Sequence, residues 1–173
     1  MIELVLGGAR SGKSRYAERQ AAASGLNVVY VATAEAGDAE MRSRIDKHRA
    51  GRDPAWLTVE EPLALAEAIR RHADAATLVL VDCLTLWLCN ALFDRDGNVQ
   101  DQHYRHEKAA LLQCARECES AVILVSNEVG MGIVAADAMS RRFVDEAGFL
   151  HQELAAVCSR VTWVAAGLPQ RLK

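Results

Sequence analysis

The residue types best suited to chemistry lie near the start of the chain, in the segment GGARSGKS at positions 7–14. A glycine, four residues and then Gly-Lys-Ser is the spacing of a phosphate-binding loop, or P-loop. Glycines let the backbone turn tightly and bring amide N–H groups close to phosphate oxygens. In such a loop Lys13 reaches the β- and γ-phosphates of a nucleoside triphosphate, and the Ser14 hydroxyl ligates Mg²⁺.

The surroundings of this loop favour a nucleotide site over a glycine-rich turn that binds nothing. The apolar run Glu3–Leu6 precedes the loop and a helical pattern follows it, and average residue usage makes a chance match about 1% or less. The positive end of the following helix would add to the attraction for phosphate. We therefore predict that the whole loop contacts the nucleotide, namely Gly7, Gly8, Ala9, Arg10, Ser11, Gly12, Lys13 and Ser14.

The acidic residue that would hold the magnesium shell is predicted to be Asp82. A P-loop enzyme usually carries such a residue at the end of a neighbouring strand. Asp82 directly follows the apolar run Leu78–Val81 and meets this requirement. The alternative is that Asp82 is an ordinary cap for the helix that follows. The presence of the loop favours the metal site.

Residues 39–52 carry an excess of positive charge, although the net charge of the chain is −3. The cations are Arg42, Arg44, Lys47, Arg49 and Arg52, and Asp46 opposes them. Met41, Ile45 and His48 share one helical face, which by itself is typical of a half-buried histidine, and a charge run is usually a solvated helix face. The local excess also fits an anionic substrate. A neutral imidazole beside a phosphate can act as a base or a nucleophile, which would suit nucleotidyl transfer in two steps.

Short apolar runs alternate with helical patterns, which predicts a parallel sheet built from βαβ units. The predicted strands are Glu3–Leu6, Val28–Ala32, Leu78–Val81, Val122–Val125 and Val161–Val164, with Leu57–Val59 as a short sixth. The predicted helices are Gly12–Ser24, Asp38–Arg49, Pro62–Ala73, Leu84–Phe93, Asp101–Glu117 and Asp137–Arg160. Nearly continuous apolar strands indicate that helices cover both faces of the sheet. The predicted fold is α/β and P-loop NTPase-like, with a mainly parallel sheet, in a single domain spanning residues 1–173.

The composition limits the partners and the compartment. A net charge of −3 argues against a dedicated nucleic-acid binder. The apolar stretches are far shorter than the ~18 residues that cross a membrane, and the N-terminus shows no signal-peptide pattern. Five cysteines without a CxxC pair are typical of reduced, buried thiols. We expect a cytoplasmic protein with no membrane span and no nucleic-acid partner.

Motifs spread over nearly the whole chain resemble those of one enzyme family. The more specific ones are EM-x-x-RI-x-x-H-x-x-GR at 40–52 and NEVGMGIV at 127–134. They are similar to the bifunctional adenosylcobinamide kinase/adenosylcobinamide-phosphate guanylyltransferases of cobalamin biosynthesis. The resemblance implies two reactions at a shared nucleotide site. A nucleoside triphosphate first phosphorylates the hydroxyl of the aminopropanol arm of adenosylcobinamide, and GTP then donates GMP to that phosphate, giving adenosylcobinamide-GDP and pyrophosphate.

The same resemblance implies roles for individual residues and partners. It places the guanylylated histidine at His48, which makes His48 and Lys13 the predicted catalytic residues. It also implies Mg²⁺ as cofactor, GTP and ATP as substrates, a corrinoid acceptor and a homo-oligomer. Nucleotide contacts beyond the P-loop fall on Ala32, Thr33, Ala34, Arg49, Ala50, Gly51, Arg52, Glu60 and Asp82. Two alternatives stay open: a P-loop kinase of another small metabolite in which His48 is structural, and a non-enzymatic nucleotide-dependent switch.

Asn127 and Glu128 follow the predicted strand Val122–Val125. They fall at the carboxyl edge of the sheet, where ligands of α/β proteins bind. We expect them only to line the site, and a purely structural turn at Gly130–Gly132 is an equal alternative.

Overall fold

A seven-stranded sheet forms the centre of the molecule in the computed structural model, which describes residues 1–34 and 53–173. The strand order is β3-β2-β4-β5-β1-β6-β7. Strands β1 to β6 run parallel, and β7 pairs antiparallel with β6 at one edge. The strands are β1 (Ile2–Gly7), β2 (Asn27–Ala32), β3 (Leu57–Glu60), β4 (Thr77–Asp82), β5 (Ala121–Asn127), β6 (Arg160–Ala165) and β7 (Leu168–Arg171). The predicted mainly parallel α/β fold is confirmed.

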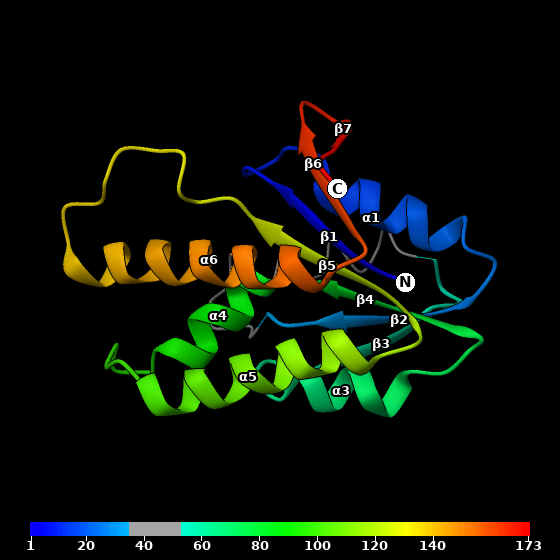
Figure 1. Cartoon of the computed structure of the whole chain (residues 1–173), viewed down its shortest axis with the longest axis horizontal. Helices are drawn as coiled ribbons and strands as arrows, with labels where there is room; N and C mark the ends of the chain where they lie inside the picture. Colours follow the sequence, from blue (N-terminus) through cyan, green and yellow to red (C-terminus); the bar gives the residue numbers. More distant parts are fainter. Residues whose placement is uncertain (35–52) are drawn as a thin grey trace.

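Helices cover both faces of the sheet, as the apolar strands predicted (Figure 1). The described helices are α1 (Lys13–Ala22), α3 (Leu65–His72), α4 (Leu84–Leu92), α5 (Asp101–Glu117) and α6 (Ala138–Val157). One apolar core forms where α3, α4, α5 and α6 pack on one face of the sheet, against side chains such as Leu4 and Leu124. A smaller core forms under α1 on the opposite face, where Tyr16 and Ala17 contact Val5. The alternation of side chains along β1 and β5 supplies both cores.

Several predicted boundaries were wrong, because contacts from outside the element set them. The predicted helix Asp137–Arg160 ends at Val157, and Arg160 begins β6 instead. The predicted helix Pro62–Ala73 begins at Leu65. The predicted helix Asp38–Arg49 lies outside the described residues.

The edge strand β7 was not predicted. It continues from β6 through a tight turn in which Ala166 and Gly167 have positive φ angles of 51° and 78°. Two successive residues of this kind form the turn that matches the twist of a β-hairpin. Pro169 is tolerated in β7 because this strand is at the edge of the sheet.

The segment between β5 and α6 stands away from the body of the molecule (Figure 1). Its apolar side chains are largely exposed, at 79% for Met131, 101% for Ile133 and 79% for Val134. Asp137 ends the segment and caps α6 by accepting a hydrogen bond from Ser140 N at 2.7 Å. In the described parts of the chain, no helix is both long and apolar enough to cross a membrane.

The strand that leads into the P-loop contains a fully buried carboxylate, Glu3. A buried charge needs partners, because its desolvation is costly. The Glu3 Oε1 atom accepts hydrogen bonds from Thr162 Oγ1 at 2.6 Å and from Tyr16 Oη at 3.1 Å. Arg160 Nη1 lies 3.5 Å from Glu3 Oε2. Glu3 therefore ties β1 to α1 and to β6.

Replacement of Thr162 by valine tests this tie. Thr162→Val keeps the shape of the side chain but removes one donor to a buried carboxylate, so we expect the free energy of unfolding to fall by about 1–3 kcal/mol. Urea denaturation followed by circular dichroism measures the change. The same substitution at Thr58, on the edge strand β3, is the control and should stay within about 0.5 kcal/mol. Equal stabilities of the two variants would contradict the role given to Glu3.

Candidate nucleotide-binding site

The P-loop lies at the carboxyl edge of the sheet, where α/β proteins bind ligands. Gly7, the last residue of β1, pairs in register with Asn127 of β5. On the other side of β5, Asp82 of β4 pairs with Val125, and Ala32 of β2 pairs with Asp82. The parallel sheet therefore brings the ends of four strands to one edge, and most of the predicted site residues are at that edge.

The backbone of the loop turns tightly and leads directly into α1. Ser11 N donates to Gly8 O at 3.2 Å, and Gly12 has a φ angle of +92°, in the left-handed region. Among the described residues, no side chain caps the first turn of α1, so its free amides face the loop as an anion site requires. The Ser11 hydroxyl is buried and has no hydrogen-bond partner within the described residues. Such a polar group is expected to find a partner, which supports a ligand at the loop.

Lys13 is the cation at the centre of the loop. Its side chain is buried, and Nζ donates to Gly8 O at 3.3 Å. Burial lowers the pKa of the Lys13 ammonium, and the nearby Asp82 carboxylate and Cys83 thiol oppose that change. The positive charge is thus held where solvent screens it weakly, which strengthens its attraction for phosphate.

The turn between β6 and β7 supports the P-loop from behind. Gly167 N donates to Ser11 O at 2.7 Å. A Cβ atom on Gly12 would lie 3.0 Å from Gly167 Cα, and one on Gly7 would lie 2.5 Å from Val164 O. The glycines at 7 and 12 are therefore required by packing as well as by phosphate binding. This support was not predicted, and the signal that could have shown it is Ala166-Gly167 between two short strand-like runs.

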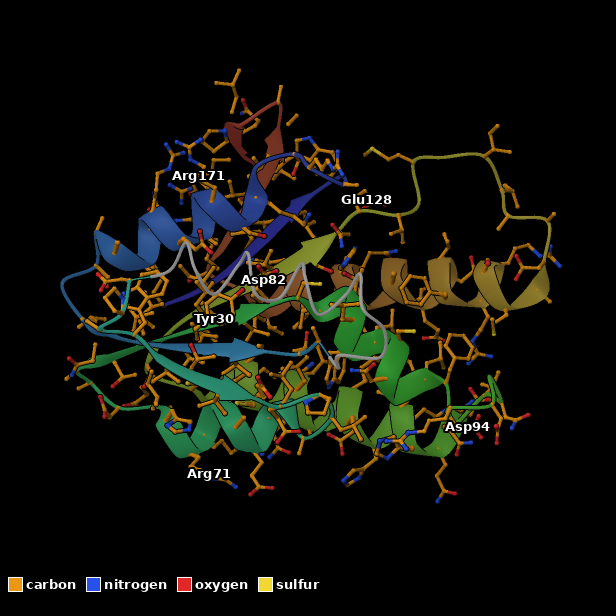
Figure 2. The ribbon with its side chains drawn as sticks, turned by 180° about the vertical axis from the view of Figure 1, so that it is seen from behind. Tyr30, Arg71, Asp82, Asp94, Glu128 and Arg171 are labelled. Carbon is orange, nitrogen blue, oxygen red and sulfur yellow. The ribbon has the colours of Figure 1, made fainter. Side chains whose placement is uncertain are left out.

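Asp82 lies at the end of β4, beside Tyr30 of β2 (Figure 2). Tyr30 Oη donates to Asp82 Oδ2 at 3.0 Å. The alternative role as a helix cap is excluded, since the N-cap residue of α4 is Cys83 and its first turn has no side-chain cap among the described residues. Strand β5 lies between β4 and the P-loop strand. Asp82 is nevertheless close enough to Lys13 to oppose the lowering of the Lys13 pKa.

The predicted contacts at Ala32–Ala34 follow β2 at the same edge. Ala32 and Ala34 are half-buried, whereas Thr33 is fully buried. The Thr33 hydroxyl donates to Cys83 O at 2.7 Å and accepts from Cys83 N at 3.0 Å. This side chain holds the ends of β2 and β4 together and so fixes the backbone next to Asp82.

Glu60 was predicted as a nucleotide contact beyond the P-loop, and it pairs in register with Ala32 at the same carboxyl edge. It is exposed at the end of β3, the outermost strand, four strands from β1. At ~4.8 Å per strand this separation is about 19 Å. His48 and the predicted contacts Arg49, Ala50, Gly51 and Arg52 lie outside the described residues, and their roles stay predictions.

Two further side chains lie between the P-loop and Asp82, at the end of β5. Asn127 Nδ2 donates to Thr85 Oγ1 at 2.9 Å. Glu128 N donates to Gly7 O at 3.0 Å, which places this residue beside the first glycine of the loop. Both were expected only as residues that could line the site.

Strand, glycine-rich loop and helix, with a buried lysine and a strand-end aspartate, define the class as a P-loop nucleotide-binding protein. Solved structures agree in fold. One of them, an ATPase domain, is 16% identical, with a TM-score of 0.50 over 94% of this chain and 68% of that one. A prototypical ATPase from the type III secretion system of pathogenic bacteria is 13% identical, with a TM-score of 0.52 over 98% of this chain and 57% of that one.

The sequence matches the family described as cobinamide kinase / cobinamide phosphate guanyltransferase over residues 3–172. It is 57% identical to the bifunctional adenosylcobalamin biosynthesis protein CobP of Pseudomonas aeruginosa, over 100% of this chain and 98% of that protein. It is 40% identical to the bifunctional adenosylcobalamin biosynthesis protein CobU of Escherichia coli, over the full length of both. The chain belongs to this family of enzymes, and the predicted resemblance is confirmed.

The support of the P-loop by the hairpin turn predicts a selective effect of Gly12→Ala. The added methyl group meets Gly167 Cα at 3.0 Å and the residue keeps a left-handed φ, so the loop must shift. We expect nucleotide affinity to fall at least about tenfold, measured by titration calorimetry. Gly25→Ala is the matched control, since Gly25 also has a positive φ, of 72°, but has open space around its Cβ position. The left-handed φ alone should cost each variant about 1–2 kcal/mol of stability, and Gly12→Ala should lose more because of its contact with Gly167. An equal loss of affinity in both would contradict the packing argument.

Proposed function

We propose that this chain performs two successive reactions at one nucleotide site. In the first, a nucleoside triphosphate phosphorylates the hydroxyl of the aminopropanol arm of adenosylcobinamide. In the second, GTP transfers GMP to that phosphate, giving adenosylcobinamide-GDP and pyrophosphate. The observation that carries the proposal is the buried Lys13 beside Asp82 at a P-loop, in a chain that matches the kinase/guanyltransferase family over residues 3–172.

The P-loop contributes electrostatic stabilisation to both reactions. Phosphoryl transfer depends mainly on positioning and on offsetting the charge that develops on the phosphate oxygens. The amides of the loop and the first turn of α1 supply fixed donors, and Lys13 supplies a cation held in a poorly screened site. The β6–β7 turn holds the backbone of the loop through the hydrogen bond from Gly167 N to Ser11 O, which supports amide donors that are in place before the nucleotide binds.

We propose that Ser14 and Asp82 hold Mg²⁺. Both side chains are half-buried at the carboxyl edge, and Tyr30 occupies one oxygen of Asp82. The described residues contain no cluster of three acidic, histidine or cysteine side chains. A site with only a few protein ligands suits Mg²⁺, because this ion keeps several waters and binds the phosphates of its substrate. The ion would supply positive charge next to the transferred phosphate.

His48 is the proposed nucleophile of the second reaction. A neutral ring nitrogen attacks the α-phosphorus of GTP, the bond to pyrophosphate breaks, and a phosphoramidate holds GMP on the enzyme. An oxygen of adenosylcobinamide phosphate then attacks the same phosphorus and releases the histidine. Two displacements give net retention at that phosphorus. Arg49 and Arg52 would steady the phosphates. A cytoplasmic location stays a prediction from the composition, and a homo-oligomer stays a prediction from the family resemblance.

A change of the Mg²⁺ requirement tests the role of Asp82. Asp82→Asn removes a charge but keeps the size of the side chain, so the Mg²⁺ concentration for half-maximal activity should rise at least about tenfold in both reactions. Activity is titrated with Mg²⁺ at saturating nucleotide. Asp145→Asn, on the exposed side of α6, is the control with the same charge change. An unchanged titration in Asp82→Asn would remove Asp82 from the metal site.

The covalent step is tested by mixing the enzyme with α-labelled GTP and Mg²⁺ and denaturing it. Wild-type protein should retain an acid-labile, base-stable adduct, because it carries GMP on a histidine nitrogen. His48→Ala should lose the adduct and GMP transfer while retaining part of the kinase activity, whereas Lys13→Ala should lose both activities. His106→Ala, an exposed histidine of α5, is the control. Formation of adenosylcobinamide-GDP at the wild-type rate by folded His48→Ala would refute the covalent mechanism.

A further inference from the structure

Glu128 is a carboxylate at the nucleotide site that the two reactions above do not yet use. Its own N–H binds Gly7 O at 3.0 Å, so it stands at the first residue of the P-loop. Figure 2 shows it where β5 passes into the segment before α6. Its side chain is 21% exposed, which leaves it reachable by a substrate.

The carboxylate is held from two sides. Gly130 N donates to Glu128 Oε1 at 2.6 Å. On the other side His151 Nδ1 lies 3.8 Å from Glu128 Oε2, an electrostatic contact rather than a hydrogen bond. His151 Nε2 lies 2.7 Å from the hydroxyl of the fully buried Ser126. Within the described residues the turn binds Oε1 and no hydrogen bond reaches Oε2, so Oε2 is the oxygen that can take a further partner.

The buried histidine explains why Glu128 is held in place. His151 lies on the face of α6 that packs into the core, and Ser126 points to the same face of the sheet. Burial lowers the pKa of His151, and the Glu128 carboxylate opposes that change. Ser126 Oγ and His151 Nε2 share a hydrogen bond whose donor depends on the ring tautomer, and the other ring nitrogen, Nδ1, faces Glu128.

We propose that Glu128 is the proton acceptor for the hydroxyl that is phosphorylated in the first reaction, an inference that rests on the proposed function. The O–H bond of the acceptor breaks as its oxygen attacks the γ-phosphorus. The proton passes to Glu128 Oε2, the new O–P bond forms, and the bond from the γ-phosphorus to the bridging oxygen breaks to release a nucleoside diphosphate.

Other described carboxylates at this edge are less suited to the task. Asp82 is bound by Tyr30 and is proposed to hold Mg²⁺. Glu61 Oε1 accepts the amides of Leu63 and Ala64 ahead of α3. Glu60 is four strands from the P-loop. Glu128 directly follows the residue that pairs with Gly7 and so lies beside the loop.

The two acceptors differ in whether they need a base. The hydroxyl of the first reaction has to lose a proton as it attacks, and a positioned base contributes about 10²–10⁴-fold to such a step. The phosphate of the second reaction is already ionised near neutral pH, and the neutral nitrogen of His48 has no proton to lose at the attacking atom. Glu128 is therefore required for the kinase reaction and dispensable for GMP transfer.

The test replaces Glu128 by glutamine in the full-length enzyme. Glu128→Gln keeps an oxygen that can accept from Gly130 N but cannot take a proton. Three quantities are measured: phosphorylation of adenosylcobinamide, formation of the GMP adduct, and GMP transfer to supplied adenosylcobinamide phosphate. We expect the first kcat to fall at least about 100-fold with the nucleotide KM unchanged, and the other two to stay within about threefold. Glu119→Gln, exposed ahead of β5 at the opposite edge, is the control.

The outcomes separate the possible roles of this carboxylate. Phosphorylation by Glu128→Gln at the wild-type rate would show that Glu128 only shapes the turn, and would overturn the proposal. Loss of all three activities in a folded protein would also overturn it, since the defect would then belong to the site as a whole. Failure of the proposed function is distinct, because wild-type enzyme would then form neither the phosphorylated corrinoid nor the GMP adduct.

Discussion

The hydrogen bond from Gly167 N to Ser11 O fixes the P-loop, and the nucleotide site depends on it. Amides stabilise phosphate strongly only when they point at it before the reaction. The turn between β6 and β7 meets this requirement by packing against Gly12. Because β6 is hydrogen-bonded to β1, the turn and the loop belong to one rigid part of the sheet. The turn at residues 166–167, near the C-terminus, thus holds the anion site that residues 7–14 form near the N-terminus.

The electrostatics of the site follow from how the sheet spaces its charges. Lys13 and Asp82 come from opposite sides of β5, and each is held by a neighbour: Lys13 by Gly8 O and Asp82 by Tyr30. Burial alone would favour a neutral lysine, but the carboxylate nearby opposes that tendency. The lysine lies at the loop, and the carboxylate lies at the position proposed for Mg²⁺.

Local patterns predicted the P-loop, the parallel sheet and the place of Asp82 at a strand end, because spacing and apolar runs encode them directly. Features set by distant contacts were missed. The hairpin strand β7 is exposed and contains Pro169, so it carries no strand signal, and only pairing with β6 defines it. The helical pattern of α6 continues past Val157 in the sequence. Arg160 is nevertheless the first residue of β6, where its guanidinium forms an ion pair with Glu3. A glutamate inside an apolar strand is understood only once Thr162 and Tyr16 are seen to bind it.

The two proposed reactions occur at different phosphates of a nucleoside triphosphate, the γ-phosphate in the first and the α-phosphate in the second. The residues proposed for them follow different strands of the sheet. Strand β2 ends at Ala32, and the segment that contains His48 comes after it in the sequence, whereas Glu128 follows β5 beside the first glycine of the loop. The proposed base and the proposed nucleophile belong to segments that follow different strands in the sequence, β5 for Glu128 and β2 for His48. One P-loop can then serve a hydroxyl acceptor that must lose a proton and a phosphate acceptor that need not.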